Sequence, residues 1–318
     1  MEMIRVGMVG LGWAGMKHLA ALASLEGVEI AGLAGTAKAD AMALAGNAPH
    51  FGTAKEMIER VQMDAIFLCV TPERHEGLEQ LCAQKGIHMY IEKPIEVDYA
   101  RACAIDEAIA LSDVLVSVGY QERYHPGIAR AREFLSGRRI RLIHGQWIGH
   151  VVGAQWWRTK ARSGGQIIEQ STHIFDIIRY LSGDGRVVSA QAFTGVAPGS
   201  LANDVEPASI ATLLMDNGAI GEVTTGCFLD EKMGGDIGLS LWCDDGRVEF
   251  DWVGGEVRLI CGDTIENIVA PGGQHAAAVS AFIEAVRTND GAGILSPYAD
   301  ALKSFAMTVD AQSLIDAQ

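Results

Sequence analysis

The chain has 318 residues, of which 49% are hydrophobic, and this is enough apolar sequence for the cores of two domains. A net charge of −15 argues against a nucleic-acid surface, and no apolar run is long enough to span a membrane. The N-terminus lacks the basic region of a secretory signal, and the six cysteines have no C-x-x-C spacing, which fits free thiols in a reducing cytosol. We therefore expect a cytoplasmic protein without a nucleic-acid or membrane partner.

The first third of the chain alternates strand-like and helix-like segments. Continuous apolar runs predict buried strands at 4–12, 28–35, 64–70, 87–93 and 113–120. Helical patterns lie between them, at 13–25, before residue 64, at 72–86 and at 98–112. This alternation is typical of a parallel sheet that is covered by helices on both faces.

The pattern changes after about residue 121. Helices are predicted at 126–137 and 172–183, and a long extended segment lies at 139–151. Turn signals such as MDNGA and CDDGR then separate strand-like pieces, which indicates hairpins in a largely antiparallel sheet. These pieces are 187–196, 208–215, 219–229, 237–244, 246–253, 256–262 and 264–270, and helices near 274–288 and 298–315 follow them. We expect a first domain of residues 1–121 and a second of residues 122–318.

A glycine motif joins the first predicted strand to the first predicted helix. The stretch VGLGWAG places Gly10, Gly12 and Gly15 in a G-x-G-x-x-G pattern. In dinucleotide-binding units the first glycine permits a tight turn, the second lets the backbone approach the pyrophosphate, and the third allows close helix–strand packing. The helix N-terminus also offers free N–H groups to a phosphate. The residues predicted to bind the cofactor here are Gly10, Leu11, Gly12, Trp13, Ala14 and Gly15.

The end of the second predicted strand bears on which cofactor is used. NAD-binding versions place an acidic residue there, on the adenosine ribose. This chain has Gly35, followed by Thr36 and then Lys38, so that a hydroxyl and an amine stand where a carboxylate would repel a 2′-phosphate. Asp40 is close, and a shift in strand register would change this interpretation. The pattern favours NADP and leaves NAD open.

Four segments together resemble the glucose–fructose oxidoreductase / inositol dehydrogenase / MocA family. They are VGLGWAG, CVTPERHEG, IEKPIEVD and WWRTKARSGGQIIEQSTHIFDIIRYLSGD, and they are spread over most of the chain. The resemblance implies an N-terminal Rossmann domain, followed by an α/β domain built on a large, mostly antiparallel open sheet. It also implies hydride transfer between nicotinamide and a hydroxyl or carbonyl of a sugar or polyol, in a homodimer or homotetramer formed through that sheet.

Within this resemblance, the triplet Glu92-Lys93-Pro94 follows a predicted strand. Ligands of open parallel sheets bind beyond the carboxyl ends of the strands, so the Lys93 amine can point to where nicotinamide and substrate meet. Pro94 cannot continue the strand pairing and fixes the local backbone, and in many family members the bond before it is cis. Glu92 is expected to orient this loop or to face the cofactor.

The second domain contributes a histidine. Family members commonly read G-G-G-x-x-x-D-x-G-x-H where this chain reads SGGQIIEQSTH, so that His173 matches and Glu169 replaces an aspartate or asparagine. If the segment is helical, Glu169 and His173 share a face, and Asp176 can join them. Oxidation of a secondary alcohol also releases the hydroxyl proton to a base. We expect Lys93 and His173 to be the acid–base and hydroxyl-binding pair, with Glu169 as a polar anchor, and leave open which takes the proton.

The resemblance also implies a wider set of contacts. Cofactor contacts are expected from Thr71, Pro72, His75 and Gln121, and substrate contacts from Arg123, Trp157, Arg158 and Asp176. Arg158 could equally pair with an acid in a structural role. No metal site is expected, because the nine histidines include no H-x-x-x-H or H-E-x-x-H pair.

Two other functions stay open beside an NAD(P)-dependent oxidoreductase acting on CH–OH groups. The first is a glycoside hydrolase that retains its nicotinamide, oxidises a glycoside carbon transiently and eliminates the aglycone. The second is a non-catalytic sensor that uses the Rossmann fold to bind a nucleotide. Loss of Lys93 or His173 would have favoured the sensor, and both residues are present.

Overall fold

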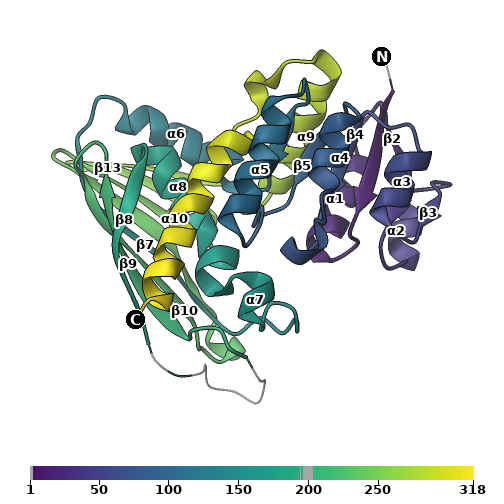
Figure 1. Cartoon of the computed structure of the whole chain (residues 1–318). Coiled ribbons are helices and arrows are strands. Elements are labelled where there is room, and N and C mark those ends of the chain that lie inside the picture. The colour runs from purple at the N-terminus through teal and green to yellow at the C-terminus, as the bar shows by residue number, and fades with distance from the viewer. Residues whose placement is uncertain (1–2, 194, 196–202) are drawn as a thin grey trace. The chain divides into compact units, whose positions relative to one another are not determined.

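The structure is a computed structural model that describes residues 3–193, 195 and 203–318. The chain divides into two compact units, coloured by residue number in Figure 1. The first unit comprises Met1–Gln121 and Gln274–Leu302, and the second comprises Glu122–Gly273 and Lys303–Gln318. This division differs from the expected second domain of residues 122–318, because residues 274–302 group with the first unit.

The first unit is built on a six-stranded parallel sheet. Its strands are, in order across the sheet, β3 (His50–Phe51), β2 (Val28–Ala34), β1 (Ile4–Val9), β4 (Ala65–Leu68), β5 (His88–Ile91) and β6 (Val116–Val118). This is the strand order of a dinucleotide-binding Rossmann sheet, and it confirms the predicted parallel sheet. The sequence did not signal β3, because two residues are too few to show a pattern.

Helices connect these strands and complete the unit. They are α1 (Trp13–Ala23), α2 (Ala39–Leu44), α3 (Ala54–Arg60), α4 (Leu78–Gln84), α5 (Tyr99–Ala110) and α9 (Gln274–Thr288), with short 3₁₀ turns at Pro72–Arg74 and Gly291–Gly293. The helix expected over 72–86 begins only at Leu78, because Gly77 has a φ of 83° and interrupts the helical backbone.

Packing explains why α9 belongs to the first unit. The ring of Phe282 on α9 lies edge-on to Phe67 of β4 and Tyr90 of β5, with ring centroids 5.6 and 5.8 Å apart. Beyond the helix, the Ser296 hydroxyl donates to the carbonyl oxygen of Val118 in β6 over 2.6 Å. These contacts join residues that are distant in the sequence, which is why the sequence pattern did not reveal them.

The second unit is built on an eight-stranded sheet. Its strands are, in order across the sheet, β14 (Thr264–Val269), β13 (Glu256–Cys261), β12 (Arg247–Asp251), β11 (Asp236–Cys243), β7 (Ile140–Gly149), β10 (Ile220–Cys227), β9 (Ala208–Met215) and β8 (Gly185–Ala192). Neighbours are antiparallel except β7 and β10, which confirms the mostly antiparallel sheet. The strand expected at 187–196 ends at Ala192, and residues 194 and 196 lie outside the described residues.

One face of this sheet is covered by helices (Figure 1). The helices of the unit are α6 (Pro126–Leu135), α7 (Lys160–Ser163), α8 (Thr172–Ser182) and α10 (Tyr298–Asp316), whose first residues belong to the first unit. A π-helical turn at Ile167–Ser171 precedes α8, and 3₁₀ turns lie at Gln121–Tyr124, which begins on the last residue of the first unit, and at Glu231–Met233.

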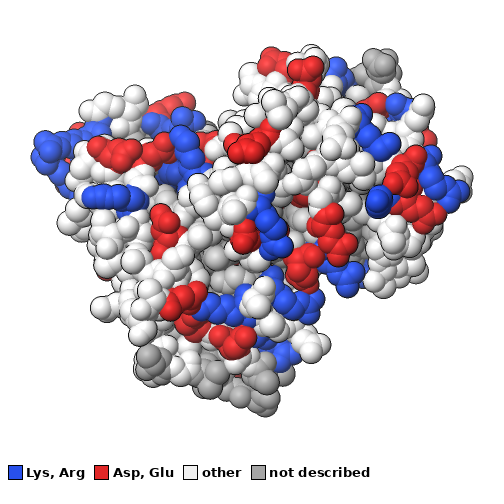
Figure 2. Space-filling model, viewed as in Figure 1, with Lys and Arg blue, Asp and Glu red and all other residues white. Residues whose placement is uncertain are grey.

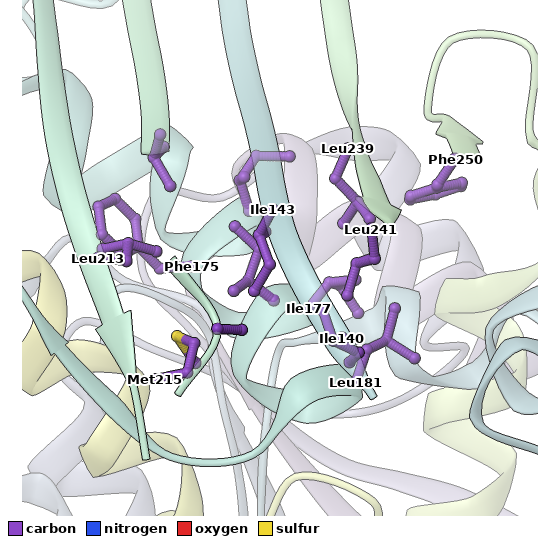
Figure 3. Packing of buried hydrophobic residues seen from close by; sticks show 14 of the residues in the cluster. Ile140, Ile143, Phe175, Ile177, Leu181, Leu213, Met215, Leu239, Leu241 and Phe250 are labelled. Carbon is purple, nitrogen blue, oxygen red and sulfur yellow. The ribbon is translucent and has the colours of Figure 1, made fainter. Parts of the chain in front are cut away.

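The core of the second unit lies between the sheet and α8. Figure 3 shows Ile143 of β7, Leu213 of β9 and Leu241 of β11 packed together with Phe175 and Ile177 of α8, and all five are essentially buried. α8 contributes buried residues over nearly its whole length. Successive side chains of a strand point to opposite faces of the sheet. The strand residues next in sequence to these core residues therefore lie on the other, more exposed face.

The viewed surface mixes both signs of charge. Figure 2 shows lysine and arginine side chains interspersed with aspartate and glutamate. Several charged side chains of the second unit form ion pairs. Arg141 contacts Asp244 over 2.6 Å, and Arg130 contacts Glu266 over 2.9 Å. Within the part of the chain that the structure describes, no helix combines the length and apolar character needed to cross a membrane.

Candidate functional site

The glycine loop lies between β1 and α1, as predicted, and its three glycines have three different surroundings. Gly10 has a φ of 85°, and a Cβ there would come 2.2 Å from the carbonyl oxygen of Cys69. A Cβ on Gly15 would come 1.9 Å from the carbonyl oxygen of Gly10. A Cβ on Gly12 would meet no described atom within 4 Å. Gly10 is thus required by the turn, and Gly15 by the close packing of the helix against the loop. Gly12 leaves space for a pyrophosphate.

The N-terminus of α1 can hold an anion. Gly12 is its N-cap and provides no side-chain hydrogen bond, so the first backbone N–H groups of the helix are available to a phosphate. Leu11 is buried, whereas Trp13 is 70% exposed. The Lys17 ammonium lies 3.8 Å from the centroid of the Trp13 ring and adds positive charge beside the loop. These residues fit the phosphate groups of a dinucleotide.

The residues predicted to face the cofactor's ribose are exposed and follow β2. Gly35 has a φ of 121°, and its carbonyl oxygen is 2.8 Å from Nε2 of His50. An acidic side chain at position 35 would be strained, because L-residues rarely adopt this φ. Thr36 and Lys38 are exposed, and Lys38 is the residue before α2.

The E-K-P loop follows β5, and its Lys93–Pro94 peptide bond is cis. The buried Glu92 carboxylate accepts a hydrogen bond from Nε2 of His18 over 2.6 Å and one from the backbone N–H of Lys93 over 3.2 Å. Burial raises the pKa of Glu92, but the hydrogen bond and charge of His18, with the nearby Lys93, lower it more, so the net shift is downward. Glu92 is thus an ionised acceptor that holds the loop carrying Lys93.

The segment after β4 carries another buried pair. Thr71 and Pro72 open a 3₁₀ turn, and Nδ1 of the buried His75 is hydrogen-bonded to the buried Glu79 carboxylate. Burial lowers the pKa of His75, but the charge and hydrogen bond of Glu79 outweigh this effect and raise the pKa overall. The buried Gln121 follows β6 and begins the next 3₁₀ turn.

In the second unit the glycine pair leads into an irregular helix. Gly164 and Gly165 have φ values of 78° and 82°, and the next turn, Ile167–Ser171, is π-helical. Glu169 lies in this π-helical turn and His173 lies in α8, so the two do not have the regular α-helical i, i+4 relation that we expected. Such π-helical turns are frequent at functional sites.

The structure gives Glu169 and His173 different neighbours. The buried Glu169 accepts a hydrogen bond from Nε1 of Trp157 over 2.6 Å. The His173 ring is stacked on Trp147, with centroids 5.6 Å apart, and lies 5.1 Å from the Trp252 centroid at a tilt. Trp157 itself is 1% exposed and packs with Val205 and Cys227, so its ring belongs to a small core.

Arg123 and Asp176 are brought together. Asp176 accepts hydrogen bonds from Arg123 over 2.8 and 2.5 Å and from the Ser304 hydroxyl over 2.7 Å. Each of the two charged side chains is 1% exposed. Each residue of this predicted substrate-binding pair therefore has the other as its partner. Arg158 is half-buried and lies just before α7, on the segment that carries Trp157.

Several residues near these groups were missed by the sequence reasoning. His18 and His275 accompany Glu92, and Trp147 and Trp252 accompany His173. His18 could have been suspected, because it follows Gly15 on the helix of the glycine motif. In the structure it is wholly buried. The other three lie in segments without a motif. Within the described ranges, no group of three or more His, Cys, Asp or Glu residues is arranged to hold a metal ion.

Comparison with protein families gives matches over both units. Residues 4–120 match the model of an oxidoreductase family with a NAD-binding Rossmann fold, and residues 137–249 match the GFO/IDH/MocA C-terminal domain. The chain is 29% identical to the rhizopine catabolism protein MocA of Rhizobium meliloti, over 58% of each protein. It is 26% identical to scyllo-inositol 2-dehydrogenase (NAD(+)) of Bacillus subtilis, over 53% of this chain and 50% of that enzyme. The matched segments thus span between half and two thirds of these relatives.

Solved structures share the fold over nearly the whole chain. Levoglucosan dehydrogenase in complex with NADH and levoglucosan has a TM-score of 0.88 at 17% identity, covering 99% of this chain and 98% of that one. UDP-N-acetylglucosamine 3-dehydrogenase from Acidithiobacillus ferrooxidans has a TM-score of 0.82 at 18% identity, covering 100% and 99%. At these identities the likeness establishes the fold.

Proposed function

The chain belongs to the GFO/IDH/MocA oxidoreductase family, and we propose on this premise that it transfers hydride between a nicotinamide cofactor and a hydroxyl or carbonyl of a sugar or polyol. One observation carries the proposal. In the parallel sheet β1, β4 and β5 are neighbours, so the glycine loop after β1 and the Lys93 loop after β5 lie at the same edge of the sheet. A dinucleotide and a catalytic amine belong at that edge.

The chemistry divides between cofactor and protein. When bound, the oxidised cofactor supplies the hydride acceptor, and the substrate hydroxyl must lose its proton as its carbon loses hydride. We assign the acid–base and hydroxyl-binding roles to Lys93 and His173. Glu169 is an anchor whose position is fixed by Trp157. The aromatic rings of Trp147 and Trp252 hold the His173 imidazole in one orientation.

The proposed substrate contacts change in light of the geometry. The Arg123 and Asp176 side chains pair with each other and are deeply buried. These contacts favour a structural role for the pair over contact with the substrate. Trp157 likewise supports Glu169, and Arg158 is the basic residue that we retain as a substrate contact. The relatives named for inositol and levoglucosan support ring-shaped polyhydroxylated substrates for this chain.

The choice between NADP and NAD is a separate proposal. The matching family model describes an NAD-binding Rossmann fold, and one neighbouring structure contains NADH. We favour NADP, with Thr36 and Lys38 contacting the 2′-phosphate, because an acidic side chain would be strained at position 35. NAD remains the alternative.

We also propose a homodimer or homotetramer and a cytoplasmic location. The face of the second sheet away from its helices carries exposed apolar residues, among them Leu142, Ile210 and Ile220, which a second copy could cover. The six cysteines are free thiols, which fits a reducing compartment. Sedimentation of the purified protein would measure the oligomeric state, and a monomer at micromolar concentration would contradict the proposed assembly.

The test of the proposed function is an activity screen with each cofactor. NADH and NADPH absorbance is followed with a panel of inositols, anhydrosugars, sugars and sugar acids. Lys93→Ala and His173→Ala are compared with Lys55→Ala, which removes an exposed lysine of α3. We expect turnover that falls by at least about a hundredfold in the first two variants and stays within twofold in the third. Cofactor binding without redox turnover on any substrate would overturn the proposal in favour of a retained-nicotinamide hydrolase or a sensor.

A further inference from the structure

We propose that His18 is a positioning residue for the Lys93 loop: it fixes the Glu92 carboxylate, which in turn holds the backbone of Lys93. This inference rests on the proposed function only in giving Lys93 a role in the reaction. The contacts themselves lie within the first unit. His18 lies on α1, the helix that begins at the glycine loop, and Glu92 follows β5.

The two hydrogen bonds use different oxygens of one carboxylate. Nε2 of His18 lies 2.6 Å from Oε1 of Glu92, and the Lys93 N–H donates to Oε2 over 3.2 Å. The first bond therefore sets the orientation in which the second is made. Because both bonds involve an ionised carboxylate that is 8% exposed, they are stronger than bonds between neutral groups.

The surroundings leave the carboxylate little freedom. A Cβ at Gly119 would come 2.9 Å from Oε2 of Glu92, so the backbone of Gly119 closes one side. The His18 ring is wholly buried, and its centroid is 4.8 Å from that of Tyr90 and 5.8 Å from that of His275. Nδ1 of His18 has no hydrogen-bond partner among the described residues, so its one polar contact is the bond to Glu92.

The placement of His18 ties two loops to one helix. α1 presents its N-terminal N–H groups at the glycine loop and, one turn later, presents His18 to Glu92. The backbone of Lys93 is thereby fixed relative to the helix that would hold the pyrophosphate. A reaction that requires hydride and proton transfer at adjacent atoms depends on such alignment, and small displacements cost rate.

Two amide substitutions separate this role from simple packing. In His18→Gln the side-chain nitrogen can occupy the place of Nε2 and still donate to Glu92. In His18→Asn it occupies the place of Nδ1 and cannot reach. The matched control is His88→Asn, at a half-buried histidine of β5 whose Nδ1 accepts a hydrogen bond from the backbone N–H of Leu115, because the asparagine amide oxygen can take the place of Nδ1 and keep that bond. All three variants are made in the full chain and compared with the wild type.

The first measurement is hydrogen exchange of the peptide that covers residues 89–97, which requires neither cofactor nor turnover. We expect His18→Asn to increase amide exchange in the Lys93 loop about tenfold, while His18→Gln and His88→Asn stay within about threefold of the wild type. Equal exchange in His18→Asn and His18→Gln would overturn the inference, because the ring would then act only by filling space.

The second measurement separates positioning from cofactor binding. In the activity screen we expect His18→Asn to lower kcat about tenfold and leave the cofactor Kd within about twofold, with kcat largely restored in His18→Gln. A loss confined to cofactor affinity would contradict the inference. If the wild type shows no turnover, the proposed function fails, and the exchange experiment still decides whether His18 holds the loop.

Discussion

The indole N–H of Trp157 donates to the Glu169 carboxylate over 2.6 Å, and both side chains are buried in the second unit. The sequence suggested that Trp157 contacts the substrate and that Glu169 is a polar anchor beside His173. In the structure, the Trp157 indole fixes the orientation of the Glu169 carboxylate through this hydrogen bond. This matters because Glu169 is longer than the aspartate usual at this position, and a longer side chain needs a partner to keep one orientation.

The first prediction concerns this bond. Trp157→Phe keeps most of the ring and removes the N–H, so Glu169 loses a donor in a buried place. We expect the free energy of unfolding to fall by about 1.5–3 kcal/mol, measured by urea denaturation. Trp156→Phe, the same change at the half-buried neighbour, is the control. Equal losses in the two variants would show that ring size, not the hydrogen bond, sets the effect.

The second prediction concerns the cofactor. Thr36→Asp places a carboxylate beside the strained position 35 without replacing Gly35, whose φ of 121° excludes that change. The new charge would repel a 2′-phosphate, so we expect the Kd for NADPH to rise about tenfold or more while that for NADH is unchanged or lower. Thr36→Asn is the uncharged control and should shift neither value more than about threefold. An unchanged Kd for NADPH in Thr36→Asp would argue against a 2′-phosphate site here.

The third prediction concerns the buried ion pair of Arg123 and Asp176. Arg123→Met leaves the Asp176 carboxylate buried without its main partner, and we expect a loss of about 3–5 kcal/mol in the free energy of unfolding. The double variant Arg123→Met with Asp176→Leu removes both charges. It should recover at least half of the loss by calorimetry or denaturant melts. A double variant that is no more stable than the single one would contradict this account.

The fourth prediction concerns pH. Side-chain hydrogen bonds from Arg5 hold the pKa of Asp64 below its ordinary value, although partial burial opposes them. A carboxyl whose pKa is lower in the folded state stabilises the fold above its unfolded pKa of about 3.9, and this contribution is lost as pH falls through the folded value. Asp64→Asn should therefore cost about 1 kcal/mol at pH 7, a modest effect because the pair is partly exposed, and almost nothing near pH 2.

The control for this series is Asp263→Asn, on the exposed turn between β13 and β14. Its stability difference from the wild type should be small at every pH in the range. A difference for Asp64→Asn that persists unchanged below pH 3 would show that the side chain acts through its shape or hydrogen bonds alone.

The sequence predicted the parts of the fold that depend on local patterns. The parallel sheet, the antiparallel sheet and the two last helices follow from hydrophobic period and turn residues, and all are present. The sequence did not predict that the helix expected over 72–86 begins only at Leu78, because this start depends on the backbone conformation of Gly77. The place of α9 depends on Phe282 finding Phe67 and Tyr90, a contact that no local pattern encodes.

The candidate site likewise contains residues that a local pattern reveals and side-chain pairings that no local pattern reveals. Gly10, Gly12 and Gly15 could be recognised because their spacing has a mechanical reason, and the surroundings of each glycine agree with it. The E-K-P triplet likewise pointed to Lys93. The pairings of His18 with Glu92, of Trp157 with Glu169 and of Arg123 with Asp176 could not be predicted. They depend on where side chains point after folding, and polar residues that look free in a sequence are commonly each other's partners.

Residues 274–302 belong to the first unit, although they follow most of the second unit in the sequence. This order has a consequence for synthesis on the ribosome. The strands bearing Phe67 and Tyr90 leave the ribosome long before Phe282, the ring that packs on them. At the usual rate of translation the delay is on the order of ten seconds or more. During that interval the nascent Rossmann sheet has an uncovered apolar surface, on which a chaperone could bind. A gene fragment that stops at residue 121 would keep this surface permanently and should aggregate when it is expressed alone.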